Sequence, residues 1–159
     1  MKSKKKFFFN PILKSISIYQ TKFGKNVEII EPVNIYKAKI GKNCKIGPFV
    51  EIQKKVIIGN NTKVQSHSFI CELVKIGQNC FIGHGVNFIN DRFKLRKPAN
   101  GNRKLWNKTL IGNKVFIGSN STILPVKICS NVVIGAGSVV TKDIKKPGVY
   151  CGNPAKKIK

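Results

Sequence analysis

The fold of this chain is decided by residues 40–88, IGKNCKIGPFVEIQKKVIIGNNTKVQSHSFICELVKIGQNCFIGHGVNF. Counted from the first, every sixth residue of this stretch is aliphatic or aromatic, and the pattern returns over residues 111–140. The residue that follows is often glycine, which suits a tight corner because it lacks a Cβ. An α-helix repeats every 3.6 residues or so and drifts out of phase with a period of six, whereas a short strand followed by a corner does not. The pattern therefore predicts an all-β parallel β-helix, with three short strands in each triangular coil of about 18 residues.

Counting by this period places about six coils, at residues 23–39, 40–57, 58–75, 76–93, 111–127 and 128–144. Two steps of the register are one residue short, from Ile35 to Ile40 and from Ile123 to Ile128. Residues 93–108, FKLRKPANGNRKLWNK, have no period, and we expect them to form a loop extruded from a corner, where function often resides. The domain organisation is interpreted as a basic leader and N-terminal cap (1–22), the β-helix domain (23–144) and a short C-terminal tail (145–159).

The composition limits the classes of function. The chain has 159 residues, of which 42% are hydrophobic, and this is enough for one folded domain. Its net charge is +24, but only three of the 30 basic residues are arginine, and the lysines are spread along the chain. Base recognition favours arginine forks and stacked aromatic side chains. The distribution therefore argues against nucleic-acid binding and suits a small anionic substrate.

The sequence carries no clear membrane or metal signal. No apolar run approaches the roughly 20 residues of a membrane helix, so we expect no membrane insertion and a cytoplasmic location. The five cysteines are odd in number and form no C-x-x-C pair. We expect reduced, mostly buried thiols, with no disulfide framework and no metal site.

Four segments together resemble one known family. They are residues 46–93, which end in FIGHGVNFINDRF, then TLIGNKVFIGSNSTIL (109–124), IGAGSVVTKDI (134–144) and GNPAKKIK (152–159). They are similar to the left-handed β-helix N-acetyltransferases that acetylate the 3-amino group of nucleotide-linked sugars. The repeat alone is specific only for the fold, and FIGHGVNFINDRF is the sharper signal. One departure is that the family reads ILPGVKIG or ILCGVTIG where this chain has ILPVKIC, so a glycine is missing before Val126.

The resemblance, which covers roughly residues 23–159, implies several further properties. The coils are expected to be left-handed, and acetyl-CoA is the expected donor. The acceptor is expected to be a dTDP- or UDP-linked amino sugar, made for a surface polysaccharide such as the lipopolysaccharide O-antigen. The protein is expected to be a homotrimer with active sites between its subunits.

The coil length also predicts which residues stack, because each residue lies above the one roughly 18 positions earlier. Three columns concern the site: Pro48, Ser66 and His84; Phe49, His67 and Gly85; and Lys54, Glu72 and Asn90. His67 and His84 are the only histidines of the chain, and both fall on the same corner edge of the prism. Such an edge faces outward, where a neighbouring subunit can meet it.

Acetyl transfer from a thioester to an amine needs a neutral amine, a route for its proton and a donor for the oxyanion. On the resemblance, we expect His84 to be the catalytic base and Asn90 to orient the sugar amine or the acetyl oxygen. Alternatives stay open at both positions. His84 can instead hold a corner or bind the sugar, with the departing sulfur of CoA collecting the proton. Asn90 can simply open the loop.

Four further residues are candidates for substrate binding: His67, Glu72, Asp91 and Arg92. Asp91 and Arg92 can hold sugar hydroxyls or the pyrophosphate, although Asp91 can equally cap a turn. Glu72 can contact the sugar or form an ordinary ion pair with Lys54.

The candidates for binding acetyl-CoA are Ala136, Gly137, Ser138, Asn153, Pro154, Lys156 and Lys157. The first three resemble the corner that lines the pantetheine, and the others resemble the closing turn, whose lysines meet the CoA phosphates. They can also be no more than a small-residue corner and a basic chain end. Two other functions stay open. One is a hexapeptide-repeat O-acetyltransferase acting on a sugar or small-metabolite hydroxyl, and the other is a non-enzymatic basic β-helix binding module.

Overall fold

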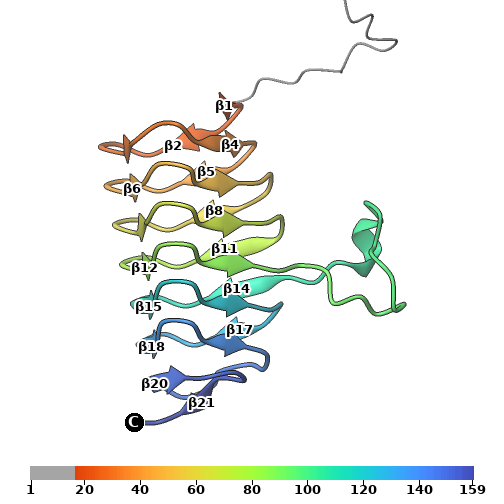
Figure 1. The fold of residues 1–159 in the computed structure, drawn as a ribbon. Helices are drawn as coiled ribbons and strands as arrows, with labels where there is room; N and C mark the ends of the chain where they lie inside the picture. Colours follow the sequence, from red (N-terminus) through yellow and green to blue (C-terminus); the bar gives the residue numbers. More distant parts are fainter. Residues whose placement is uncertain (1–16) are drawn as a thin grey trace, which may run out of the picture.

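The computed structural model describes residues 17–159, which form a column of stacked triangular coils (Figure 1). Residues 1–16 of the expected leader lie outside the described residues. From β1 to β18 each coil contributes one short strand to each of three sheets, which we name A, B and C. Neighbouring strands are parallel, except for the last pair, β20 and β21. The predicted all-β, left-handed parallel β-helix is confirmed.

The strands are two to four residues long. Sheet A contains β1 (Ile18–Tyr19), β4 (Asn34–Tyr36), β7 (Glu51–Ile52), β10 (Phe69–Ile70), β13 (Asn87–Phe88), β16 (Thr122–Ile123) and β19 (Val139–Val140). Sheet B contains β2 (Lys22–Phe23), β5 (Lys39–Ile40), β8 (Ile57–Ile58), β11 (Val74–Ile76), β14 (Thr109–Ile111) and β17 (Lys127–Ile128). Sheet C contains β3 (Glu28–Ile29), β6 (Lys45–Ile46), β9 (Lys63–Val64), β12 (Phe81–Ile82), β15 (Val115–Ile117), β18 (Val132–Ile134), β20 (Gly148–Cys151) and β21 (Lys156–Lys157).

The chain passes from sheet A to B to C in each coil, so the prism has an A–B edge, a B–C edge and a C–A edge. Within a strand the inward residue is the aliphatic one of the six-residue period, as with Ile46 and Ile82, which are fully buried. The residue before it points outward. On sheet C, for example, the outward residues Lys45, Lys63 and Phe81 lie side by side on β6, β9 and β12. Stacking places like residues above one another, so the core is a set of isoleucine and valine columns.

The β-helix extends beyond the predicted limits at both ends. β1 lies within the residues interpreted as leader and cap, and its Ile18 pairs with Ile35, which is 17 rather than 18 residues further along the chain. β2 begins at Lys22, one residue before the predicted β-helix domain. β20 and β21 lie within the expected tail and lengthen sheet C. Six coils, β1 to β18, have a strand in every sheet within residues 17–159. The coil that follows has β19 and β20, but on the side of sheet B it has only a single bridge, between Ile128 and Ile144.

The expected loop leaves the A–B edge after β13 and returns at β14, and it projects from the side of the column (Figure 1). It contains one short 3₁₀ helix, η1 (Arg103–Leu105), which begins after Asn102, whose side chain accepts a hydrogen bond from Lys104 N. The loop does not disturb the coils, since Ile76 on one side of it pairs with Ile111 on the other. It is therefore an insertion into an otherwise continuous prism.

The cysteines are free, and three of the five, Cys44, Cys71 and Cys80, are buried. Burial raises the pKa of all three thiols, and that of Cys71 reaches about 12. They are neutral packing groups at neutral pH, as the sequence predicted.

Candidate functional site

His84 lies at the C–A edge, in the corner that follows β12. Its Nδ1 is 2.8 Å from Oγ of Ser66, which occupies the same corner one coil earlier, as the predicted column requires. The corner turns tightly because Gly85 has a φ of +63°, and a Cβ at Gly83 would lie only 2.7 Å from the backbone nitrogen of Ser119. The imidazole is exposed, and Nε2 has no hydrogen-bond partner among residues 17–159. Ser66 thus holds one ring nitrogen and leaves the other available.

His67 takes part in a different contact on the same edge. Its ring stacks on that of Phe49, with the ring centroids 4.8 Å apart and the planes at 13°. Both residues have positive φ, 61° and 59°, a conformation in which bulky side chains are uncommon. The predicted column of Phe49 and His67 is therefore present, and it places an exposed aromatic pair beside Ser66. A role of His67 in substrate binding stays a prediction.

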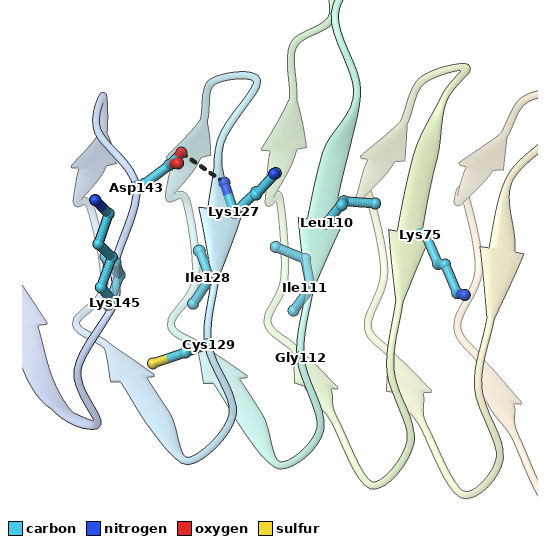
Figure 2. A pocket seen from close by; sticks show the side chains of 10 residues that line it. Lys75, Leu110, Ile111, Gly112, Lys127, Ile128, Cys129, Asp143 and Lys145 are labelled. Atoms are coloured by element: carbon cyan, nitrogen blue, oxygen red, sulfur yellow. Dashed lines mark hydrogen bonds between the residues drawn. The ribbon is translucent and has the colours of Figure 1, made fainter.

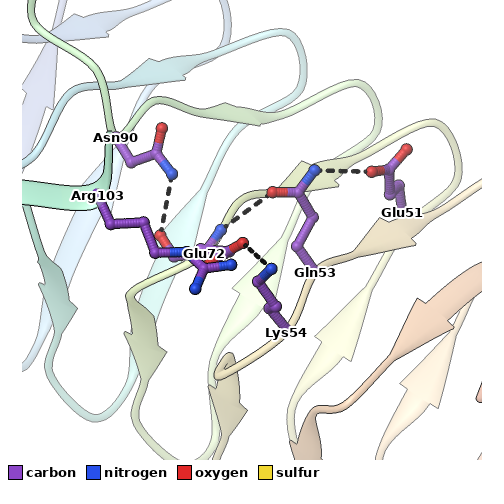
Figure 3. Close-up of polar contacts among 6 residues, drawn as sticks. All are labelled: Glu51, Gln53, Lys54, Glu72, Asn90 and Arg103. Atoms are coloured by element: carbon purple, nitrogen blue, oxygen red, sulfur yellow. Dashed lines mark hydrogen bonds and ion pairs between the residues drawn. The ribbon is translucent and has the colours of Figure 1, made fainter. Parts of the chain in front are cut away.

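Glu72 lies at the other edge of sheet A, the A–B edge, and joins the coil to the loop (Figure 3). Its side chain is only 6% exposed, and Oε1 lies 3.1 Å from Nζ of Lys54. Nε of Arg103, which belongs to η1, lies 3.3 Å from Oε2, an ion pair without the angle of a hydrogen bond. Gln53 accepts a hydrogen bond from the backbone nitrogen of Glu72. The ion pair with Lys54 that the sequence left open is present, and Arg103 is a second partner that the sequence did not suggest.

Asn90 and Asp91 organise the root of the loop. Asn90 donates from Nδ2 to the carbonyl of Glu72 at 3.4 Å, and its own carbonyl accepts from the backbone nitrogen of Asn107 at 2.9 Å. Both carboxylate oxygens of Asp91 accept backbone hydrogen bonds inside the loop, from Phe93 at 2.9 Å and from Ala99 at 2.7 Å. The turn-capping alternative for Asp91 and the loop-opening alternative for Asn90 thus correspond to observed contacts.

Arg92 binds the coil that follows the loop. Its guanidinium donates to the carbonyl of Pro125, in the corner between β16 and β17. This is the corner where the glycine of the resembling family is missing, and the neighbouring Val126 is buried. The shortened corner therefore supplies the acceptor that holds Arg92.

The two expected catalytic residues are not brought together within one chain. His84 precedes β13 and lies at the C–A edge, whereas Asn90 follows β13 and lies at the A–B edge. Sheet A separates the two edges, and each residue is held by neighbours on its own side, Ser66 for His84 and Glu72 for Asn90. A site that uses both side chains must take them from two chains.

The expected cofactor residues gather near the edge that carries His84. Ala136 and Gly137 are exposed at the C–A edge, one coil beyond Ser119, which follows His84 in the same column. Ser138 is fully buried, and its hydroxyl accepts a hydrogen bond from Gly152 N at 3.1 Å, so that hydroxyl serves the corner. The remaining residues close the chain: Asn153 and Pro154 in the exposed turn after β20, and Lys156 and Lys157 in β21, also exposed.

A hollow lies on sheet B, lined by none of the residues that the sequence singled out (Figure 2). It is a groove of about 760 Å³ lined by Lys75, Leu110, Ile111, Gly112, Lys127, Ile128, Cys129, Asp143, Ile144 and Lys145. A second hollow of about 250 Å³ adjoins it and shares Lys127 and Asp143. The sequence could have indicated part of this groove, because Lys75, Leu110 and Lys127 occupy the outward position of the repeat and align across β11, β14 and β17.

Two features are absent from residues 17–159. No group of three or more His, Cys, Asp or Glu side chains in this part of the chain is placed to hold a metal ion. Over the same residues, no helix has the length and apolar character needed to cross a membrane.

Comparisons with known proteins agree with the repeat. The model of the bacterial transferase hexapeptide (six repeats) matches residues 37–72, and that of the hexapeptide repeat of succinyl-transferase matches residues 73–86 and 108–142. Together they cover more than half of the chain. The bifunctional protein GlmU of Clostridium kluyveri is 41% identical over 99 residues, which are 62% of this chain and 19% of that protein. The chain thus spans about a fifth of the length of the curated relatives it matches.

Solved structures share the fold. A hexapeptide transferase family protein from Anaplasma phagocytophilum superposes with a TM-score of 0.70 at 22% identity, covering 89% of this chain and 81% of that one. A galactoside acetyltransferase in complex with coenzyme A superposes with a TM-score of 0.61 at 29% identity, covering 89% of this chain and 64% of that one. Because the two hexapeptide-repeat models together match residues 37–86 and 108–142, this chain belongs to the hexapeptide-repeat transferase family.

Proposed function

We propose that this protein is an acetyl-CoA-dependent N-acetyltransferase that acetylates the 3-amino group of a dTDP- or UDP-linked sugar. The product is a 3-acetamido sugar for a surface polysaccharide such as the O-antigen, and the reaction takes place in the cytoplasm. The proposal combines the family of the chain with the resemblance of residues 81–93 to the sugar N-acetyltransferases.

The observation that carries the proposal is the pair of His84 and Ser66. When Nδ1 carries the ring proton, it donates to Ser66 Oγ at 2.8 Å and leaves the lone pair of Nε2 directed away from the corner. A neutral imidazole oriented in this way is suited to general-base catalysis. It lies on the edge that also carries Ala136 and Gly137, the residues expected to line acetyl-CoA.

The reaction that this geometry supports is a direct transfer. The nitrogen lone pair of the sugar amine attacks the thioester carbonyl, a C–N bond forms and the C–S bond breaks. Nε2 of His84 accepts the proton released by the amine and passes it to the departing sulfur, which leaves as the CoA thiol. An amide donor such as Asn90 can orient the acetyl oxygen or the amine.

The separation of His84 from Asn90 supports the homotrimer. The two residues lie on opposite edges of sheet A, so one substrate can meet both only where the C–A edge of one subunit faces the A–B edge of the next. The loop and its root then belong to a site whose base comes from a neighbouring subunit.

A second acceptor class is favoured by one comparison. The galactoside acetyltransferase, similar at 29% identity, is named for a galactoside acceptor rather than for a nucleotide-linked amino sugar. The same base and donor can acetylate a hydroxyl group, because His84 then accepts the hydroxyl proton. The acceptor that the protein acetylates, an amino sugar or a galactoside, therefore distinguishes the N-acetyltransferase from the O-acetyltransferase.

The test is release of the CoA thiol from acetyl-CoA with a panel of dTDP- and UDP-linked 3-amino and 4-amino sugars, followed by galactosides. We expect turnover with a 3-amino sugar, a fall in kcat of about 10²- to 10⁴-fold in His84→Ala, and a smaller fall in Ser66→Ala, which only loses the orienting contact. Full turnover in His84→Ala would leave the reaction in place and assign the proton to the departing sulfur. Turnover with galactosides alone would refute the amino-sugar acceptor, and no thiol release with any acceptor would refute the transferase.

A further inference from the structure

We propose that the groove on sheet B and the hollow beside it form one binding site for an organic diphosphate. Apart from Arg92, a candidate for substrate binding, the site uses none of the residues that the sequence singled out. That its ligand is either coenzyme A or a nucleoside diphosphate sugar rests on the proposed function. The presence of a diphosphate site rests on the groove itself.

The two hollows form a continuous basic region. They share Lys127 and Asp143, and six of their 16 lining residues are basic: Lys75, Arg92, Lys94, Lys108, Lys127 and Lys145. This share is about twice that of the whole chain, in which 30 of 159 residues are basic. Asp143 is the only acidic residue among the 16. The hollow thus concentrates a positive charge that elsewhere is spread over the surface, and it attracts anions.

The repeat places the lysines at regular positions. Lys75, Leu110 and Lys127 are aligned on three adjacent strands, so the two lysines stand on either side of Leu110 at roughly 10 Å, twice the usual strand spacing. In Figure 2, Lys75 and Lys145 lie toward the two ends of the groove, with Lys127 between them. Lysine binds phosphate as a compact charge with three donors, so this spacing allows two linked phosphate groups to be held from both sides.

The hollow exists because sheet B ends early. β17 is the last strand of this sheet in the described part of the chain, and beyond it only Ile144 pairs with Ile128. The segment of Asp143 and Lys145 therefore forms a wall rather than another strand. The two stems of the loop close the second hollow, with Arg92 fixed to the carbonyl of Pro125.

The apolar part of the groove favours an organic ligand. Leu110, which is 36% exposed, and the half-buried Cys129 line it alongside the aliphatic stems of the lysines, whereas Ile111, Ile128 and Ile144 border it from the core, where each is buried. Inorganic phosphate makes no use of this apolar surface, whereas a ligand with an apolar arm or a flat base beside its phosphates buries it. Coenzyme A and the dTDP- or UDP-linked sugars both have two linked phosphates next to such a part, and the groove suits this shared chemistry.

Asp143 offers a sharp test because it opposes the anion without contributing to the floor. Its Oδ1 accepts a hydrogen bond from the backbone nitrogen of Lys127 at 2.8 Å, and the amide oxygen of asparagine can do the same. Asp143→Asn therefore removes a negative charge and keeps the contact. A variant that gains affinity cannot be explained by a damaged fold.

The experiment is calorimetric titration of the full chain with coenzyme A, UDP, dTDP and inorganic pyrophosphate. We expect at least one organic diphosphate to bind more tightly than pyrophosphate. We expect its Kd to rise about tenfold in Lys127→Ala and to fall about threefold in Asp143→Asn. The matched control is Lys63→Ala, an exposed lysine at the same outward position of a strand on sheet C, which is expected to leave Kd unchanged. Which probe binds tells whether the donor or the acceptor occupies the groove.

Three results would overturn the proposal: no binding of any organic diphosphate, equal losses in Lys127→Ala and Lys63→Ala, or pyrophosphate binding as tightly as the organic probes. The first two mean no site or only general surface charge, and the third means that the apolar floor is not used. The binding readout is independent of turnover. Loss of diphosphate binding in Lys127→Ala, in a protein that acetylates no acceptor, would keep the groove and refute the proposed function.

Discussion

The buried carboxylate of Glu72 is predicted to hold the loop against the coils, and Glu72→Gln tests this directly. The substitution keeps the shape of the side chain and removes the negative charge that lies between Lys54, at 3.1 Å, and Arg103, at 3.3 Å. It leaves those two cations facing each other in a chain that already carries a net charge of +24. The coil and the loop should then separate more easily at this point.

The exposures of the three side chains set the size of the effect. The side chain of Glu72 is 6% exposed, but those of Lys54 and Arg103 are 30% and 48% exposed, so both cations can return to water. Breaking a fully buried pair costs about 3 to 5 kcal/mol, and an exposed pair contributes less than about 1 kcal/mol. We therefore expect Glu72→Gln to lower the free energy of unfolding by about 1 to 2 kcal/mol. Arg103→Ala removes only the more exposed partner and should cost about 0.5 kcal/mol.

The assay combines urea unfolding with amide hydrogen exchange of residues 93–108. Both variants should increase exchange in the loop, and the double variant should cost less than the sum of the single variants, because both remove one shared contact. Exchange in the coils should rise by no more than the lower global stability requires, about 5- to 30-fold, so the additional increase should be confined to the loop. Wild-type stability and wild-type loop exchange in Glu72→Gln would refute the reasoning, since the ion pairs would then contribute nothing to holding the loop.

Three further predictions follow from the coils. Gly83→Ala would force a Cβ to 2.7 Å from the backbone nitrogen of Ser119, and we expect a loss of about 1 to 3 kcal/mol in thermal unfolding. Asn61 has a φ of 55°, and its side chain forms hydrogen bonds with those of Asn43, at 3.0 Å, and Asn79, at 3.1 Å, in an asparagine column of the B–C edge. Asn61→Ala should therefore destabilise the protein by about 1 to 2 kcal/mol. Asn61→Gly should cost less, because glycine adopts a positive φ without strain. Burial raises the pKa of Cys71 from 9.0 to about 12. The thiol of the unfolded chain therefore ionises first, and the free energy of unfolding should fall as the pH rises from 9 to 12. Urea unfolding at each pH should show that Cys71→Ala loses this part of the pH dependence.

The contacts of the central coils could be predicted from the sequence with unusual detail. The columns of Ser66 with His84 and of Phe49 with His67 are present as the coil length required. The reason is that a β-helix pairs each residue with one at a fixed distance along the chain, so a local period is also a map of contacts. In most folds, contacts between distant segments cannot be obtained by counting.

The same counting failed where the period changes. The strand of Ile18 was missed because the spacing from Ile18 to Phe23 is one residue short of six, and the segment after residue 144 was taken for a tail although β20 continues sheet C. Short spacings move the aliphatic residues out of the six-residue register without preventing the strands from pairing. The ends of a repeat are therefore its least predictable part.

The sequence by itself determined the three-sided prism, its inward residues and the edge on which His84 lies, because these follow from the period alone. Only the tertiary structure decided that Arg103 pairs with Glu72, since the loop has no period that relates it to the coils. It also decided that the early end of sheet B leaves a groove lined by lysines. These features depend on where the chain departs from its repeat, and such departures become contacts and hollows only when the coils are stacked in space.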